Sequence, residues 1–259
     1  MNTNRRKNTL KTLFATLLLC GSSAASASDW KWSIAPYAWA TDVGADVSLD
    51  DRQVIDEEIA FTDLLEDLET VSQVHIEAQH GAHGVMFDVF DVQLADEDSR
   101  VTLPGKAGEA ALSSEIGMTI LEFGGLYDPN GDQKGFALLY GTRILDQRAE
   151  IDAEFDLSSN TNVRQTYEAG ETLVDGLVGV RYIQIISPRW TWLVRADASA
   201  GGTELTWSAG SAIAYAFGRN GRYALTAGYR HMQVDFESDE SVDTEMTLSG
   251  FFAGLRTSF

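Results

Sequence analysis

The stretch "DGLVGVRYIQI", residues 175–185, alternates apolar side chains around a central Arg181. Three further stretches repeat this Gly-x-Arg pattern in an apolar strand: "LYGTRIL" around Arg143, "AGYRHM" around Arg230 and "AGLRTSF" around Arg256. Because successive side chains of a strand point to opposite faces, each arginine shares one face with its glycine, and apolar residues occupy the other. Strands with one polar and one apolar face are typical of membrane β-barrels, whose outer surface contacts lipid.

The same alternation predicts an inward, polar face for charged residues on other strands. An arginine facing lipid costs about 2–4 kcal/mol at the bilayer midplane, whereas inside a barrel it can pair with carboxylates. The predicted lumen charge network is Glu77, Asp88, Glu122, Arg143, Asp175, Arg181, Arg195, Asp197, Arg230 and Arg256.

This lumen charge network has two interpretations. It either fills and stabilises the barrel interior, or it lines a narrow pore and selects ions by charge. The glycine two positions before each of the four arginines faces the lumen as well. Because glycine has no side chain, we expect it to leave room for an arginine from a neighbouring strand.

The N-terminus predicts export. Four basic residues between positions 5 and 11 precede the short apolar segment "LFATLLL", and "ASAS" supplies small residues for cleavage after Ala27. Residues 1–27 are therefore expected to be a cleaved signal peptide, followed by a single domain over 28–259. Lipid modification of Cys20 is the alternative, but Leu19 stands where lipoprotein signals have a small residue.

Composition argues against several functions. Cys20 is the one cysteine, so the mature protein is expected to have neither a disulfide nor a thiolate metal site. Removing residues 1–27 takes away four basic residues and no acidic one, so the formal net charge changes from −20 to −24. This charge disfavours binding to nucleic acid. No phosphate-binding loop or metal cluster appears in the sequence, and we expect no cofactor and no metal.

Turn residues divide the mature chain into ten strands. The tight turns "GAHG", "DPNGD", "SPR" and "GRNGR" follow the second, fourth, sixth and eighth strands, and the other connections are mostly longer and often acidic. Short turns at one end, longer loops at the other and an even strand count are features of outer-membrane barrels. The sequence therefore predicts an all-β fold, an antiparallel transmembrane β-barrel of ten strands.

The chain ends on an apolar face with an aromatic terminus. Counting back by twos from Phe259 gives Thr257, Leu255, Ala253 and Phe251. This pattern resembles the signal by which the barrel assembly machinery recognises outer-membrane proteins, although Thr257 stands where an aromatic residue is commoner. We expect Phe251, Leu255 and Phe259 to form the assembly signal, and the assembly machinery to be a partner.

Nearly the whole mature chain resembles an uncharacterised family of Gram-negative outer-membrane β-barrel proteins. The resemblance rests on "APYAWA", "FTDLLEDLE", "HIEAQHGAHGVMFDV", "LLYGTRI", "VDGLVGVRY", "RWTWLVRADASAGG", "LTWSAGSAIAYAFG", "LTAGYRH" and "SGFFAGLRTSF". Gly176 and Thr257 depart from the family, which often has proline and an aromatic residue there. The resemblance implies an outer-membrane barrel without an assigned reaction or ligand. Family members share the pattern at Glu77, Asp88, Arg143, Asp175, Arg181, Arg195, Asp197 and Arg230.

Residues 41–70 form an acidic insert with eleven acidic residues and one basic residue. Its apolar residues Phe61, Leu64, Leu65 and Leu68 recur at helical spacing and predict a short helix in this first long loop, acting as a lid or plug of the barrel. Alternatively, "ADVSL" and "EEIAF" pair as an extra hairpin, which would give twelve strands. The acidic residues form a solvated surface, or they bind divalent cations that bridge to lipopolysaccharide phosphates.

These features predict an outer-membrane protein in contact with lipid and lipopolysaccharide, with a narrow or plugged passive pore. A structural or surface-interaction barrel without transport is the alternative, and an outer-membrane hydrolase is a second one. The hydrolase reading depends on His75 beside Glu77 and on His231 with Asp235. Neither histidine comes with a recognisable serine or paired-aspartate signature, so we do not expect an enzyme.

Overall fold

The computed structural model describes residues 30–49, 52–64, 68–102, 108–157, 161–236 and 242–259. These residues form almost entirely antiparallel β-structure, and no helix among them has the length and apolar character needed to cross a membrane. The expected signal peptide, residues 1–27, lies outside the described residues. The elements are β1 (Lys31–Leu49), β2 (Arg52–Ile59), α2 (Phe61–Leu64), β3 (Leu68–His80), β4 (His83–Thr102), β5 (Gly108–Tyr127), β6 (Gly135–Leu157), β7 (Thr161–Ile185), β8 (Trp190–Ala200), β9 (Leu205–Phe217), the 3-10 helix η3 (Arg219–Gly221), β10 (Tyr223–Phe236) and β11 (Val242–Ser258).

Ten of the described strands close into a barrel, as the sequence predicted. Each of β3 to β11 pairs with its neighbour in the chain, β1 pairs with β3, and β11 pairs with β1 along most of its length. At the seam, the backbone N–H groups of Trp32 and Phe259 each donate to the other residue's carbonyl oxygen at 2.9 Å. We call the end with both of these residues the turn end, and the opposite end the loop end.

The strand β2 lies outside this ring. It pairs with the loop-end part of β1, with Ala45 opposite Glu57, so the two segments expected to form an extra hairpin do meet in part. The twelve-strand alternative is nevertheless wrong, because this pairing lengthens β1 and adds one strand beside it rather than two strands to the barrel wall.

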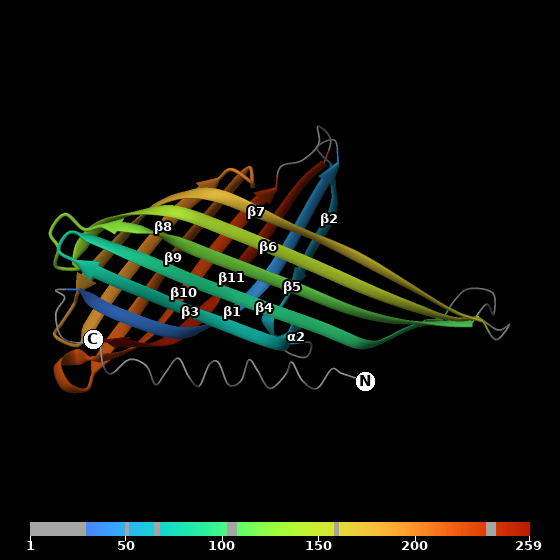
Figure 1. Ribbon diagram of the computed structural model, residues 1–259, viewed down its shortest axis with the longest axis horizontal. Helices are drawn as coiled ribbons and strands as arrows, with labels where there is room; N and C mark the ends of the chain where they lie inside the picture. The colour runs from blue at the N-terminus through green and yellow to red at the C-terminus, as the bar shows by residue number, and fades with distance from the viewer. Residues whose placement is uncertain (1–29, 50–51, 65–67, 103–107, 158–160, 237–241) are drawn as a thin grey trace.

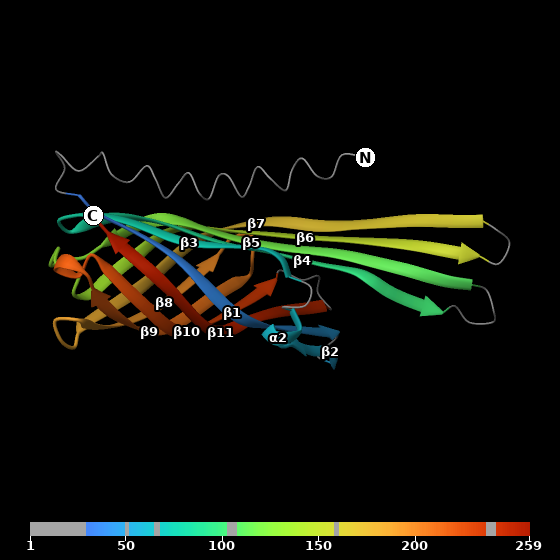
Figure 2. The ribbon, with the colours of Figure 1, turned by 90° about the horizontal axis from the view of Figure 1, so that it is seen from below.

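Four strands extend beyond the rest of the ring. The β6–β7 pairing continues to Leu157 opposite Thr161, whereas β8 pairs with β7 only as far as Gly176. Figures 1 and 2 show the loop-end parts of β4, β5, β6 and β7 running past the other strands as one long arm. The arm separates from β1, β2 and β11, which end in a different direction.

The barrel wall is split between β1 and β3 towards the loop end. Their pairing stops at Pro36 opposite Val74, and β1 pairs with β2 only from Val43 onwards. In the gap, the buried Gln73 side chain accepts a hydrogen bond from the Trp39 backbone N–H at 2.5 Å. This contact satisfies a backbone donor that no neighbouring strand pairs.

The predicted plug helix is shorter than expected. Helix α2 covers only Phe61–Leu64, because β2 occupies the preceding residues and Leu68 already begins β3; Leu65 lies outside the described residues. The Phe61 N–H donates to the Asp42 carboxylate at 2.7 Å, which fastens the helix to β1 beside the gap. Phe61, Leu64 and Leu68 line an apolar groove together with Trp39.

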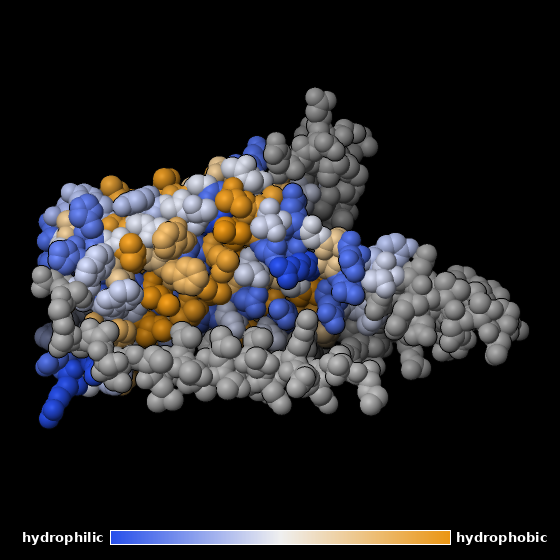
Figure 3. All heavy atoms as spheres, viewed as in Figure 1, coloured by the Kyte–Doolittle hydropathy of each residue, from blue (hydrophilic) through white to orange (hydrophobic). Residues whose placement is uncertain are grey.

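An apolar belt surrounds the outside of the barrel. Figure 3 shows it as a band of hydrophobic residues over the half of the strands nearer the turn end, with polar residues on either side. Aromatic pairs such as Phe136 with Tyr182 and Trp190 with Tyr215, whose ring centroids lie 4.7 and 4.9 Å apart, belong to its turn-end edge. The belt's exposed members include Val85, Phe87, Phe123, Leu138, Tyr140, Val178, Val180, Trp192, Ile213, Leu225, Tyr229, Phe251 and Leu255.

The glycines of the Gly-x-Arg motifs have a different role from the expected one. A Cβ on Gly141 would lie 2.3 Å from the Phe123 carbonyl oxygen, and one on Gly228 would lie 2.3 Å from the Ser211 carbonyl oxygen. The expectation that these glycines make room for a neighbouring arginine is wrong, because the atoms closest to all four are backbone or Cβ atoms of the adjacent strand and none belongs to an arginine. They permit close approach of neighbouring strands.

Candidate functional site

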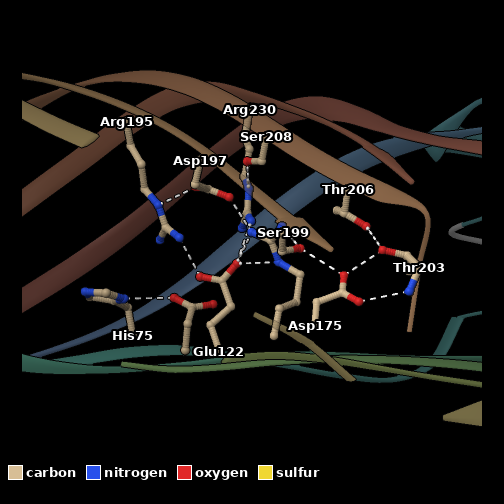
Figure 4. A network of polar contacts seen from close by, with 12 residues as sticks. His75, Glu122, Asp175, Arg195, Asp197, Ser199, Thr203, Thr206, Ser208 and Arg230 are labelled. Atoms are coloured by element: carbon tan, nitrogen blue, oxygen red, sulfur yellow. Dashed lines mark hydrogen bonds and ion pairs between the residues drawn. The ribbon is translucent and has the colours of Figure 1, made fainter. Parts of the chain in front are cut away.

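The barrel interior is the candidate site, and it is filled in layers. All ten residues of the predicted lumen charge network are inside: seven are buried, and Arg195, Arg230 and Arg256 line an internal cavity. Figure 4 shows Arg195, Asp197 and Arg230 from one side of the barrel directed towards Glu122 on the opposite wall. The charged residues thus meet across the lumen.

An ion-pair cluster centred on Glu122 joins four strands. The fully buried Arg143 guanidinium donates to Glu122 from Nε at 3.1 Å and from Nη2 at 2.7 Å, and also binds Asp197. Arg195 binds Asp197 and the second Glu122 oxygen, both at 2.7 Å, and Arg230 reaches Glu122 at 3.3 Å. Three guanidinium groups therefore share two carboxylates, which gives the cluster one excess positive charge.

A second group connects β1, β3, β4 and β7. Arg181 makes a bidentate contact with Glu77. Asp88 accepts hydrogen bonds from the Tyr37 hydroxyl at 2.8 Å and from His75 Nδ1 at 2.9 Å. The other nitrogen of His75, Nε2, lies 3.6 Å from Glu77. His75 was not among the predicted network residues, although its odd position beside Glu77 indicated the same inward face.

Among the residues that the structure describes, no arginine forms an ion pair with Asp175. Its carboxylate accepts hydrogen bonds from the backbone N–H groups of Gly202 and Thr203 at 2.9 Å, and from the hydroxyls of Ser199 and Thr203 at 3.0 and 2.6 Å. Ser199 also accepts a hydrogen bond from Arg143 and so connects Asp175 to the ion-pair cluster (Figure 4). Asp175 therefore holds the short β8–β9 turn in place.

An apolar layer fills the lumen beyond the ion-pair cluster, towards the loop end. On several strands it begins two residues after a charged position: Leu145 follows Arg143, and Met232 follows Arg230. The Arg230 guanidinium lies 4.9 Å from the centre of the Trp39 ring, at the junction of the charged and apolar regions. Continuing the strand alternation beyond the charges would have located this layer from the sequence. Its buried members are Trp39, Phe90, Ile120, Leu145, Met232, Val234, Met246 and Leu248.

Carboxylates are also placed in register outside the barrel, near its loop end. Asp46 and Asp235 lie opposite Glu245 on the two neighbouring strands. Burial raises the pKa of Glu245, and the negative charges of Asp235 and Asp46 raise it further. Among the described residues, however, no group of three or more His, Cys, Asp or Glu side chains is placed to hold a metal ion.

No protein-family model matches the chain, and no curated protein matches it. Solved structures with similarity include the outer membrane protease OmpT from Escherichia coli, at 10% identity and a TM-score of 0.38, covering 89% of this chain and 96% of that one. The toluene transporter TodX of Pseudomonas putida has 10% identity and a TM-score of 0.34, with 90% of each chain covered.

The attachment invasion locus protein Ail of Yersinia pestis has 11% identity and a TM-score of 0.33, covering 90% of this chain and 100% of that one. These similarities are too low to assign an activity or a ligand. The barrel architecture is established by the strand pairing of the chain itself.

Proposed function

We propose that this chain is an integral outer-membrane β-barrel whose lumen is plugged in its resting form. The apolar belt supports a membrane location, because an exposed apolar surface that surrounds the molecule is unfavourable in water. The inward direction of the charged side chains supports it too, since each arginine in contact with lipid would cost about 2–4 kcal/mol at the midplane.

The apolar layer is the observation that carries the proposal of a closed lumen. Side chains from β1, β4, β5, β6, β10 and β11 pack together there, so the interior beyond the ion-pair cluster contains hydrophobic contacts in place of a polar path. Ions do not cross such a region without water. Passive permeation therefore requires that the layer move or be removed.

Planar-bilayer recordings test the closed lumen. We expect the wild-type protein to show no resolved ion steps, and a Phe90→Ser/Met232→Ser/Leu248→Ser variant to show them, because small polar side chains hydrate the layer. Heat-modifiable migration establishes that both proteins fold. A matched control, Val71→Ser/Ile116→Ser/Tyr167→Ser, changes exposed apolar residues of the loop end and is expected to stay closed. Regular ion steps from the wild-type protein would contradict the proposal.

A surface-interaction role is the second candidate, and the arm favours it. Glu115, Glu150 and Glu168 are exposed there and lie opposite one another on β5, β6 and β7. Like charges directly opposite on neighbouring strands are destabilising, so a long arm with such a row is better explained by contacts beyond the barrel than by barrel stability.

The geometry gives less support to the hypothesis that the protein is a hydrolase. Both ring nitrogens of His75 face carboxylates, which favours a structural role in place of proton transfer to a nucleophile. His231 faces the outside of the barrel, where its ring lies 4.9 Å from that of Trp207. We propose that neither histidine is catalytic.

A further inference from the structure

A cavity of about 850 Å³ occupies the turn-end half of the lumen. Residues of the turn-end rim, including Gln133, Arg222 and Ser258, border it on one side. On the other side it reaches Trp39 and Arg230, which stand at the edge of the apolar layer. The cavity is therefore a vestibule that is entered from the turn end and closed towards the loop end.

The vestibule has an excess of positive charge. Arg181, Arg195, Arg230 and Arg256 line its inner part, and Lys31, Arg219 and Arg222 line its rim. The carboxylates that line it or bind these arginines are fewer: Glu77, Asp88, Glu122 and Asp197. The protein as a whole has a formal net charge of −20. A positive interior in an acidic protein concentrates anions from solution.

Two of the arginines that line the vestibule have a side-chain nitrogen without a hydrogen-bond partner. In the part of the chain that the structure describes, Arg256 takes part in no ion pair, and its buried Nε has no hydrogen-bond partner. The Nε of Arg181 is likewise buried and unpartnered, although the two terminal nitrogens of Arg181 hold Glu77. Arg181 is nine-tenths buried, at 9% relative exposure. Leaving such donors unpaired is unfavourable, and an arginine that lines a cavity without a carboxylate partner favours an anion beside it.

We infer that the vestibule binds a small organic anion, with its carboxylate or phosphate group held by Arg256 and Arg181. Guanidinium groups suit planar and tetrahedral oxyanions because two N–H groups can donate side by side. The apolar side chains Met86, Leu139 and Phe252 also line the vestibule and provide contacts for an apolar body. The ligand class is thus an amphipathic, water-soluble anion that enters from the turn end.

This inference goes beyond the plugged barrel and does not require conduction. A lipid phosphate offers the same anionic chemistry as a soluble molecule. The rim lies among turn residues such as Arg219 and Gln133, so a water-soluble ligand is favoured over a lipid that must leave the bilayer. The binding experiment therefore includes a short-chain lipid as a competitor.

Isothermal titration of the folded, detergent-solubilised protein with phenyl phosphate tests the inference. We expect one binding site, tighter than for inorganic phosphate and absent for the neutral benzyl alcohol. The Arg256→Gln variant is expected to bind at least about tenfold more weakly, since a charged hydrogen bond contributes about 1.5–3 kcal/mol. Arg256→Lys, which keeps the charge but cannot donate two parallel hydrogen bonds, is expected to bind with intermediate affinity. Arg148→Gln, on the exposed outside of β6, is the matched control and is expected to bind like wild type.

Heat-modifiable migration shows whether each variant has folded, so weak binding by a folded Arg256→Gln protein supports the inference. Absence of phenyl phosphate binding by the wild-type protein, or equal binding by wild type and Arg256→Gln, would overturn it. Displacement of phenyl phosphate by dihexanoylphosphatidylglycerol would overturn the assignment to a water-soluble ligand. These results are independent of the bilayer recordings, because a closed barrel and a conducting one can both bind an anion at this position.

Discussion

Replacing Arg143 with methionine is expected to lower the free energy of unfolding by about 3–5 kcal/mol. Arg143 is fully buried and binds Glu122, Asp197 and Ser199. Without it, two carboxylates remain in the interior with fewer positive partners, and a buried charge that loses its partner is strongly destabilising. The measurement is urea-dependent unfolding from lipid bilayers, followed by tryptophan fluorescence and heat-modifiable migration.

Arg148→Met provides the control for this prediction. Arg148 is on the same strand, binds Asp146 and is 77% exposed, so its loss is expected to change stability by less than about 1 kcal/mol. Adding Glu122→Gln to Arg143→Met is not expected to restore the lost stability, because Glu122 still binds Arg195 and Arg230. If Arg143→Met and Arg148→Met had equal effects, the ion-pair cluster would not stabilise the barrel.

An arginine introduced at Val178 is expected to destabilise the barrel by about 2–4 kcal/mol in bilayers. Val178 is 64% exposed on the outer face of β7, within the apolar belt. Thr166→Arg, on the same face of the same strand but in the arm, is expected to change stability by less than about 0.5 kcal/mol, as is usual for exposed positions.

The comparison of these two variants locates the bilayer along β7. Folding efficiency into lipid vesicles, read from heat-modifiable migration over a urea series, measures both. Similar losses at Val178 and Thr166, or none at Val178, would show that the apolar belt does not contact lipid.

The ring of ten strands was predictable because its signals are local. Period-two alternation and turns such as "DPNGD" and "GRNGR" mark each strand of the ring independently of the others. The inward placement of Arg181 follows from the same alternation, since a strand cannot turn one side chain inward without turning its neighbours outward.

The partners of the charged residues were not predictable, because they depend on register and strand tilt across the barrel. Arg181 binds Glu77, more than one hundred positions earlier in the chain, whereas Asp175 binds the β8–β9 turn in place of an arginine. The position of β2 beside β1 was not predictable either. The helical pattern that includes Leu68 also competes with strand pairing, which prevails because Leu68 begins β3 and lies opposite Leu94 of β4.

The apolar layer was not predicted, although the sequence contains its signal. Beyond the charged positions, the next inward-facing residues of the same strands, such as Leu145 and Met232, are apolar. Apolar residues on both faces of these strand segments indicate an interior that is packed beyond the charges, and this packing favours a plugged barrel over an open pore.

The most direct test of a lipid-facing belt is the environment of adjacent residues on β10 and on β11. In protein produced without residues 1–27, single cysteines at Leu225, Thr226, Phe251 and Phe252 carry a fluorescent label in vesicles. We predict that labels at 225 and 251, in the apolar belt, are quenched by brominated lipid and protected from iodide. Labels at 226 and 252, which line the vestibule, are predicted to be quenched by iodide added from the turn end and unaffected by brominated lipid. Equal quenching of neighbouring positions would contradict a lipid-facing belt around a water-accessible vestibule.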